Sequence, residues 1–240
     1  MRILITNDDG IQASQLQPLV RWAQRLGEVT VAAPKYEQSA KSHGIEIHKP
    51  FEVKQVELAP GIPAYAVDST PADCVRYAIL GLGLKFDLVI SGINRGLNIG
   101  SDILYSGTVA AVFEASRLGV PAIAFSTEPR SYEEAIEHMD RVWDYVTDHD
   151  LLALHSWYNI NIPAEPKTIR ITRQGGPYYS DDFHPVGNDL YQPHGKDIHV
   201  DSGNPELDTD SALSGHISIM PLTIDRTDLA VFKTLSALPV

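Results

Sequence analysis

The chain has 240 residues, of which 43% are apolar and 21% are charged, and its formal net charge is −12. This composition is typical of a folded globular protein and excludes disorder as the main state. The acidic balance argues against a nucleic-acid polymer as partner, because such partners are held by a broad basic surface. The single cysteine excludes an internal disulfide, and no apolar run is long enough for a membrane span. We therefore expect a cytoplasmic protein with no membrane partner.

The chain opens with alternating strand and helix patterns. Residues 2–6 are mostly apolar and β-prone, a helical apolar spacing runs from Leu16 to Leu26, and residues 28–33 form a second β-prone run. A β-α-β opening of this kind is typical of an α/β protein. We expect a Rossmann-like, doubly wound and mostly parallel sheet.

Further elements are predicted downstream in chain order. Strand-like fragments cover residues 44–48, 51–56 and 65–67. A helix begins at Pro71 after a Ser69 or Thr70 cap, because proline is favoured at the first helical position. The next predicted elements are a strand at 87–91, a helix at 108–118, a strand at 122–126 and a helix from the capping box of Ser131 and Glu134 to about residue 148.

The pattern changes after residue 150. Short β-prone runs at 159–162, 168–172 and 216–220 are separated by many Pro, Gly and Asp residues. We expect one domain over residues 1–240, in which 1–150 form the Rossmann-like core. Residues 151–240 are expected to form an irregular β-rich extension that serves oligomerisation.

Three polar clusters follow predicted strands of the core. They are Asn7-Asp8-Asp9-Gly10, Glu37-Gln38-Ser39 and Ser91-Gly92-Ile93-Asn94. Ligands of open parallel sheets bind at the carboxyl ends of the strands, so we expect these clusters to converge.

The adjacent carboxylates of Asp8 and Asp9 need a proton, a basic partner or a metal ion if they lie at a buried strand end. No Lys or Arg lies in the immediate motif, so a hard divalent cation is the favoured solution. Asp8, Asp9, Ser39 and Asn94 supply an all-oxygen ligand set suited to one Mg²⁺ or Mn²⁺. A simple turn followed by a helix N-cap is the alternative interpretation of residues 8–10.

Residues 91–108 are rich in Gly and Asn but match neither the P-loop nor the dinucleotide-binding pattern. At their end, Ser106, Gly107 and Thr108 begin a predicted helix, whose free N–H groups favour a phosphate. A helix cap is the alternative interpretation. A metal ion beside a phosphate cradle points to phosphoryl hydrolysis.

The basic and histidine side chains give weaker signals. Lys41 and Arg95 are candidate phosphate contacts. The nine histidines lack the spacing of a metal site, and we interpret His43, near the Ser39 loop, as a surface or packing residue.

Four segments in order resemble the survival protein E (SurE) family. They are residues 1–10 (MRILITNDDG), the loop 33–40, the helix entry 70–75 (TPADCV) and residues 91–111 (SGINRGLNIGSDILYSGTVAA), with a weaker similarity at 209–222. The resemblance implies a metal-dependent phosphatase that releases phosphate from nucleoside monophosphates, a 5′/3′-nucleotidase. The loop at 41–48 departs from the family pattern at Glu46. This departure bears on nucleoside specificity and not on the metal site.

The same resemblance implies roles for individual residues. One divalent cation, Mg²⁺ or Mn²⁺, is expected on Asp8, Asp9, Ser39 and Asn94, with Asp8 and Asp9 as the catalytic residues. Phosphate contacts are expected at Asn98, Ser106, Gly107 and Thr108. The C-terminal part is expected to reach a neighbouring subunit in a homodimer or homotetramer.

The expected reaction is attack on phosphorus by a metal-activated water, with Asp8 or Asp9 as a base. Direct attack by an aspartate stays open at this point. The alternatives to a nucleotidase are a phosphotransferase or nucleotide-dependent ligase, a non-catalytic nucleotide-binding module, and a phosphatase acting mainly on polyphosphate or other phosphomonoesters.

Overall fold

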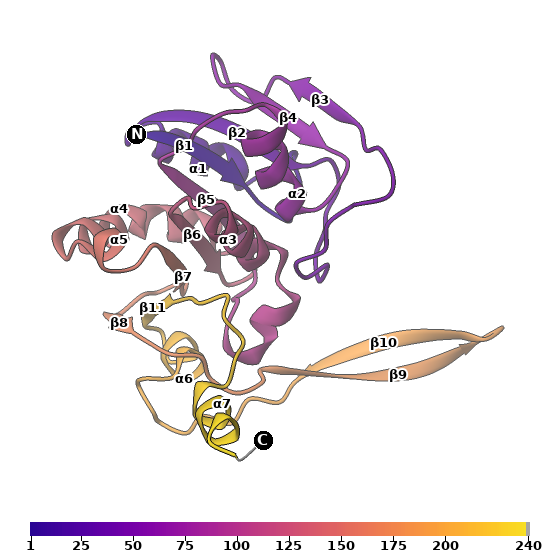
Figure 1. Cartoon of the computed structure of the whole chain (residues 1–240), viewed down its shortest axis with the longest axis vertical. Coiled ribbons are helices and arrows are strands. Elements are labelled where there is room, and N and C mark those ends of the chain that lie inside the picture. Colours follow the sequence, from indigo (N-terminus) through magenta and orange to yellow (C-terminus); the bar gives the residue numbers. More distant parts are fainter. Residues whose placement is uncertain (239–240) are drawn as a thin grey trace.

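The computed structural model describes residues 1–238, within which nine strands form one sheet in the order β3-β4-β2-β1-β5-β6-β7-β11-β8 (Figure 1). The strands are β1 (Arg2–Thr6), β2 (Glu28–Pro34), β3 (Val53–Val56), β4 (Ala64–Val67), β5 (Leu88–Arg95), β6 (Ala122–Thr127), β7 (Trp157–Ile162), β8 (Ile169–Ile171) and β11 (Ile217–Pro221). The run from β4 to β7 is parallel, whereas β3 and β11 pair antiparallel with β4 and β7. The predicted mostly parallel α/β sheet is confirmed.

Helices cover both faces of this sheet. They are α1 (Leu16–Ala23), α2 (Pro71–Arg76), the π-helix η1 (Tyr77–Gly81), the 3₁₀-helix η2 (Gly100–Tyr105), α3 (Gly107–Arg117), α4 (Tyr132–Asp148), α5 (Leu151–Leu154), α6 (Asp208–Leu213) and α7 (Leu229–Ser236). Alternate residues of β1 face opposite layers, because successive side chains of a strand point to opposite sides. Ile3 and Ile5 join the core cluster that contains α1 and α4, and Leu4 joins the one that contains α2 and α3. The sheet is therefore doubly wound.

One predicted strand of the core is absent and another is longer than predicted. Residues 44–48 form irregular backbone instead of a strand. The predicted strand at 87–91 continues to Arg95 as β5, with an irregular register against β6 between Ser91 and Asn94. Gly92 lies there at φ +135° with its Cα against the Phe125 carbonyl group, a close approach that only glycine permits. Asn94 thus lies inside the strand and not after it.

Of the two helix caps predicted from the sequence, one is confirmed and the other is not. The Thr70 hydroxyl accepts a hydrogen bond from the Asp73 N–H at 3.2 Å and caps α2, as predicted. The Ser131 side chain makes no cap hydrogen bond within the described part of the chain, so the predicted capping box does not form.

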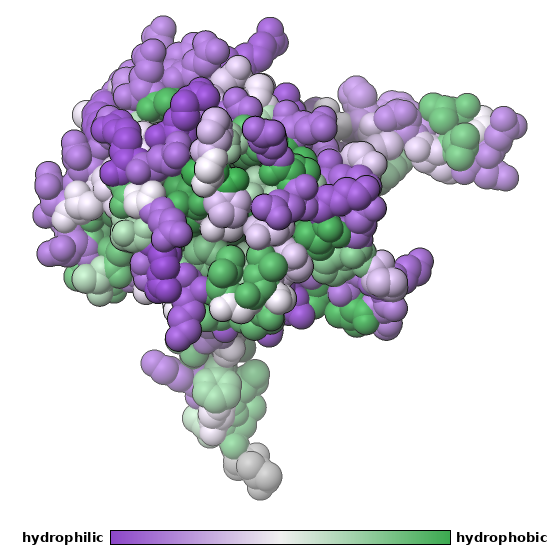
Figure 2. Space-filling view, turned by 90° about the horizontal axis from the view of Figure 1, so that it is seen from above, coloured by the Kyte–Doolittle hydropathy of each residue, from purple (hydrophilic) through white to green (hydrophobic). Residues whose placement is uncertain are grey.

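The second half of the chain extends the same sheet, because β7, β11 and β8 form one edge of it. Two strands, β9 (Tyr179–Gly187) and β10 (Leu190–Asp197), leave it as a long hairpin that projects from the body (Figure 1). Figure 2 shows that the C-terminal helix also stands out from the body, with a mostly hydrophobic surface. No helix among residues 1–238 is long and apolar enough to cross a bilayer.

The C-terminal half also fastens the glycine-rich segment. The buried carboxylate of Asp208, at the start of α6, accepts hydrogen bonds from the N–H groups of Gly100 at 2.9 Å and Gly175 at 2.7 Å. The position of η2, which leads into α3, is thereby fixed by a residue more than 100 positions further along the chain.

Candidate active site

The two adjacent aspartates follow β1 in a tight turn. The Asn7 side chain closes this turn by donating to the Gly10 carbonyl at 3.0 Å and accepting from the Gly10 N–H at 3.1 Å. Gly10 has φ +98° and packs against the backbone of residues 34–37, so the turn lies directly on the loop after β2. The buried strand and the fixed turn together hold Asp8 and Asp9 at the carboxyl edge of the sheet.

Asp8 is buried against the beginning of α3. Its Oδ1 accepts a hydrogen bond from the Thr108 hydroxyl at 2.6 Å. Burial raises the pKa of Asp8 to about 6, the negative charge of Asp9 adds to the rise, and the Thr108 bond opposes it. In this environment, a nearby positive charge stabilises the ionised form of the carboxylate.

Asp9 has a basic partner from the neighbouring strand. Both Nε and Nη2 of Arg95 lie 3.2 Å from Asp9 Oδ1, and the Gln15 amide donates to Asp9 Oδ2. Burial raises the pKa of Asp9 even though the Arg95 guanidinium lowers it. Arg95, predicted as a candidate phosphate contact, thus lies on the carboxylate pair.

The other two predicted metal ligands come from the loop after β2 and from the end of β5. The Gln38 N–H donates to the Asp8 carbonyl at 2.7 Å, which places the Ser39 loop beside Asp8. The exposed Ser39 hydroxyl itself donates to Glu37 Oε1 at 2.7 Å. The side-chain amide N–H of Asn94 donates to the Gly96 carbonyl at 2.8 Å. This bond does not use the side-chain oxygen of Asn94.

The predicted phosphate-binding residues divide into two groups. Ser106 caps α3 by accepting from the Val109 N–H at 3.1 Å, and Gly107 and Thr108 lie against Asp8. Asn98 is held elsewhere: it donates to Ser126 Oγ at 2.7 Å, and its carbonyl accepts from Asn159 and Asn161. The start of α3 therefore touches the aspartate pair, whereas Asn98 hydrogen-bonds to the ends of β6 and β7.

The donor set fits a hard divalent cation. Carboxylate, hydroxyl and amide oxygens are the ligands such ions prefer. A Cβ at Gly107 would lie 2.9 Å from Asp8 Cβ and 3.2 Å from its Oδ2, so the absence of a side chain there keeps that oxygen clear. The pairing of Arg95 with Asp9 shows that this edge of the sheet accepts a positive charge.

The comparisons with known proteins identify the family. The family model "Survival protein SurE" matches residues 3–181. The chain belongs to the SurE family. A protein named 5′-nucleotidase SurE from Desulforudis audaxviator is 39% identical over 252 residues, covering 100% of this chain and 98% of the relative. One of the same name from Pelobacter propionicus is 41% identical over 255 residues, covering 98% of each.

A solved SurE structure has the same fold. The crystal structure of the SurE protein from Aquifex aeolicus matches with a TM-score of 0.80 at 31% identity and covers 98% of both chains. The predicted membership of the SurE family is confirmed, as is the prediction that the chain is an enzyme.

Several residues around this SurE site were not predicted from the sequence. They are Gln15, Asn159, Asn161 and Asp208, which hold Asp9, the Asn98 loop and the glycine-rich segment. One signal was present: β7 reads WYNINI, in which two asparagines alternate with buried apolar residues. Buried polar side chains at every second position of a strand require partners on one face.

Proposed function

We propose that this SurE protein is a 5′-nucleotidase that hydrolyses nucleoside 5′-monophosphates to nucleoside and phosphate, with activity on 3′-monophosphates as well. The observation that carries this proposal is the contact between the aspartate pair and the start of α3, where Thr108 bonds Asp8. An acidic pair beside a helix N-terminus combines a cation site with an anion site, which is what a phosphate ester on a divalent metal requires. The names of the full-length relatives support the same reaction.

Asp8, Asp9, Ser39 and Asn94 would hold one divalent cation, Mg²⁺ or Mn²⁺. When bound, such a cation polarises a phosphoryl oxygen and lowers the pKa of a water molecule. The N–H groups at the start of α3, that of Thr108 included, and the hydroxyl group of Ser106 orient the phosphate and offset its growing charge. Asn98 is proposed as a further phosphate contact, for which its side-chain amide must leave Ser126 Oγ.

The aspartates supply the proton transfer. Thr108 donates to Oδ1 of Asp8 and holds that carboxylate in place, and Asp8 or Asp9 acts as the base that accepts a proton from the attacking water. Arg95 and Gln15 keep Asp9 in position.

A cavity beside the site supports a nucleoside as the leaving group. It has a volume of about 660 Å³ and adjoins the glycine-rich segment at Gly96 and Leu97. Tyr105, Tyr178 and Tyr179 line it, and aromatic rings of this kind stack on nucleobases. A site for inorganic polyphosphate alone does not require three aromatic side chains in its lining.

The chain's exposed apolar side chains support a homodimer or homotetramer as part of the proposal. None of residues 229–236 in α7 is buried, and Phe232 and Leu235 are 55% and 59% exposed. Such a surface is costly in water and indicates burial against another copy. We further propose that the chain has a single domain, with residues 151–240 completing the 1–150 core, and that it acts in the cytoplasm, where the free thiol of Cys74 stays reduced.

The function is tested by measuring phosphate release from 5′- and 3′-mononucleotides and polyphosphate with Mg²⁺, Mn²⁺ or a chelator. Asp9→Asn removes one charge of the pair and should nearly abolish hydrolysis while leaving the circular dichroism spectrum unchanged. Asp148→Asn, an exposed change on α4, is the matched control and should keep full activity. Unchanged turnover of D9N at saturating Mn²⁺ would overturn the assignment, and nucleotide binding without turnover would favour a binding module.

A further inference from the structure

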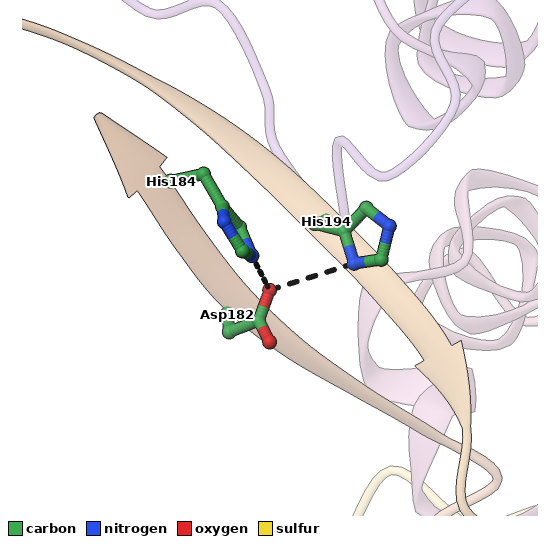
Figure 3. A group of neighbouring side chains, drawn as sticks. All are labelled: Asp182, His184 and His194. Atoms are coloured by element: carbon green, nitrogen blue, oxygen red, sulfur yellow. Dashed lines mark hydrogen bonds and ion pairs between the residues drawn. The ribbon is translucent and has the colours of Figure 1, made fainter. Parts of the chain in front are cut away.

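Three potential metal ligands lie on one face of the β9–β10 hairpin, far from the aspartate pair in the sequence. Asp182 and His184 are two positions apart in β9, and His194 is paired directly with Asp182 in β10. Residues two apart in a strand, and residues directly opposite across a ladder, share a face of the sheet. Figure 3 shows the three side chains pointing toward one another.

The distances in this group suit a metal ion. Oδ1 of Asp182 lies 2.9 Å from His184 Nε2 and 3.6 Å from His194 Nδ1, and all three ligand atoms lie within 4.8 Å of one another. A tetrahedral ion bound at about 2.0–2.2 Å to nitrogen and oxygen ligands holds those atoms roughly 3.3–3.5 Å apart. Small side-chain rotations therefore bring the three ligands onto one cation.

The surroundings leave this group accessible. Lys196 lies 3.9 Å from Oδ2 of Asp182, the oxygen that does not face the histidines. The side chains of His184 and His194 are 63% and 66% exposed, so an ion reaches them from solvent without any opening of the fold.

We propose that this face of the hairpin binds one divalent transition-metal ion of the Zn²⁺ class through Asp182, His184 and His194, with water in the remaining position. Two imidazoles and one carboxylate suit a borderline cation, whereas Mg²⁺ prefers oxygen ligands alone. The site therefore differs in metal preference from the all-oxygen set at Asp8 and Asp9, and it does not depend on the proposed nucleotidase reaction.

A metal ion here cross-links the hairpin. A two-stranded hairpin without further strands is only marginally stable in water. Because the ligands come from both strands, binding stabilises the paired form over the separated one. Zn²⁺ should thus slow hydrogen exchange of the amides in residues 179–197.

The test is titration of the full-length protein with Zn²⁺ by calorimetry and with Co²⁺ by visible absorption, in excess Mg²⁺. The wild type should bind one more equivalent of metal ion per chain than the His184→Gln/His194→Gln variant. Asp182→Asn should lower the affinity for this additional ion. The control His48→Gln/His149→Gln removes two other exposed histidines and should keep the wild-type stoichiometry. Hydrogen exchange in the hairpin should slow with Zn²⁺ in the wild type and the control, and not in the double variant.

Equal stoichiometry and affinity in wild type and the His184/His194 double variant would overturn the proposal. So would loss of the equivalent only on His199→Gln/Asp201→Asn, because these residues belong to a separate group with Asp210. A circular dichroism spectrum identical to that of the wild type establishes that the hairpin variants are folded.

Discussion

The Cα of Gly107 lies against the side chain of Asp8, so closely that an added Cβ would be 2.9 Å from Asp8 Cβ. Gly107 is the first residue of α3 and Asp8 follows β1, so this contact joins the helix start to the strand end. Through it, the parts of the site proposed to bind the phosphate and the cation have a fixed relative position.

Gly107→Ala should therefore lower kcat/KM strongly while the protein stays folded. The added methyl group must push Asp8 aside, and a displacement of about 1 Å in a catalytic group costs roughly a hundredfold in rate. Gly176→Ala is the matched control, because nothing lies within 4 Å of a Cβ at that position. Steady-state kinetics on a nucleoside monophosphate would decide, and equal activity of the two variants would contradict the predicted role of the contact.

Arg95→Gln should tighten the binding of Mn²⁺ to the substrate-free protein. The Arg95 guanidinium lies 3.2 Å from Asp9 and competes with a metal ion for the same carboxylate. The side chain is half exposed, so the lost repulsion is worth about 1 kcal/mol, or roughly fivefold in affinity. Calorimetry would measure this change.

The control for this prediction is Arg25→Gln, which removes an arginine paired with Asp140 on a different face. Its Mn²⁺ affinity should equal that of the wild type. Unchanged or weaker Mn²⁺ binding by R95Q would show that Arg95 and the cation do not share Asp9.

The stability of the fold should fall in acid because of Glu114. Burial raises the pKa of the Glu114 carboxyl. The hydrogen bond and charge of His43, together with the charges of Arg117 and Arg76, lower this pKa by more than burial raises it, so the net shift is downward. A lowered folded-state pKa gives stability that is complete above the ordinary glutamate value of about 4.5 and is lost as the pH falls below it. His43, interpreted from the sequence as a surface or packing residue, lies 2.9 Å from Glu114 in this cluster.

In Glu114→Gln, the free energy of unfolding should decrease less as the pH falls. The variant should also be less stable than the wild type at neutral pH, because Arg76 and His43 lose their charged partner. Urea unfolding at several pH values between 3 and 7, about the range over which a carboxylate titrates, measures both effects. Glu133→Gln on the exposed first turn of α4 should leave the pH profile as it is. A steeper acid-side loss in E114Q than in the wild type would contradict the assignment.

Phe232→Asp with Leu235→Asp should convert the expected homo-oligomer into a monomer. Both side chains are exposed on α7, and charges at these positions oppose burial against a second copy. Light scattering after size exclusion gives the mass. Leu154→Asp is the control, since Leu154 is 76% exposed on α5 and its replacement should leave the mass unchanged. Identical masses for all three proteins would show that α7 is not the interface.

The sequence predicted the core well because its signals are local. Apolar alternation in β1 and helical spacing in α1 depend on neighbours along the chain, and the Asp8-Asp9 turn follows directly from the end of β1. The predicted strand at 44–48 was wrong, because a β-prone fragment becomes a strand only where a sheet edge accepts it.

The parts that sequence reasoning missed depend on long-range pairing. The bonds of Asn98 with Asn159 and Asn161 and the approach of His194 to Asp182 require the folded arrangement. The histidines lack metal-site spacing in the sequence because the hairpin register, and not a short motif, brings them together. The roles of Ser39 and Asn94 stay predictions, since their side chains bond Glu37 and Gly96.

The anchoring of Gly100 by Asp208 has a consequence for the order of synthesis. A ribosome makes the aspartate turn, the glycine-rich segment and α3 long before it makes Asp208. Until that residue leaves the exit tunnel, the Gly100 N–H has no carboxylate to bind, and the start of η2 lacks this anchor. A nascent chain that stalls before this point carries every side chain proposed for the reaction and still lacks the bond from Asp208 to the glycine-rich segment.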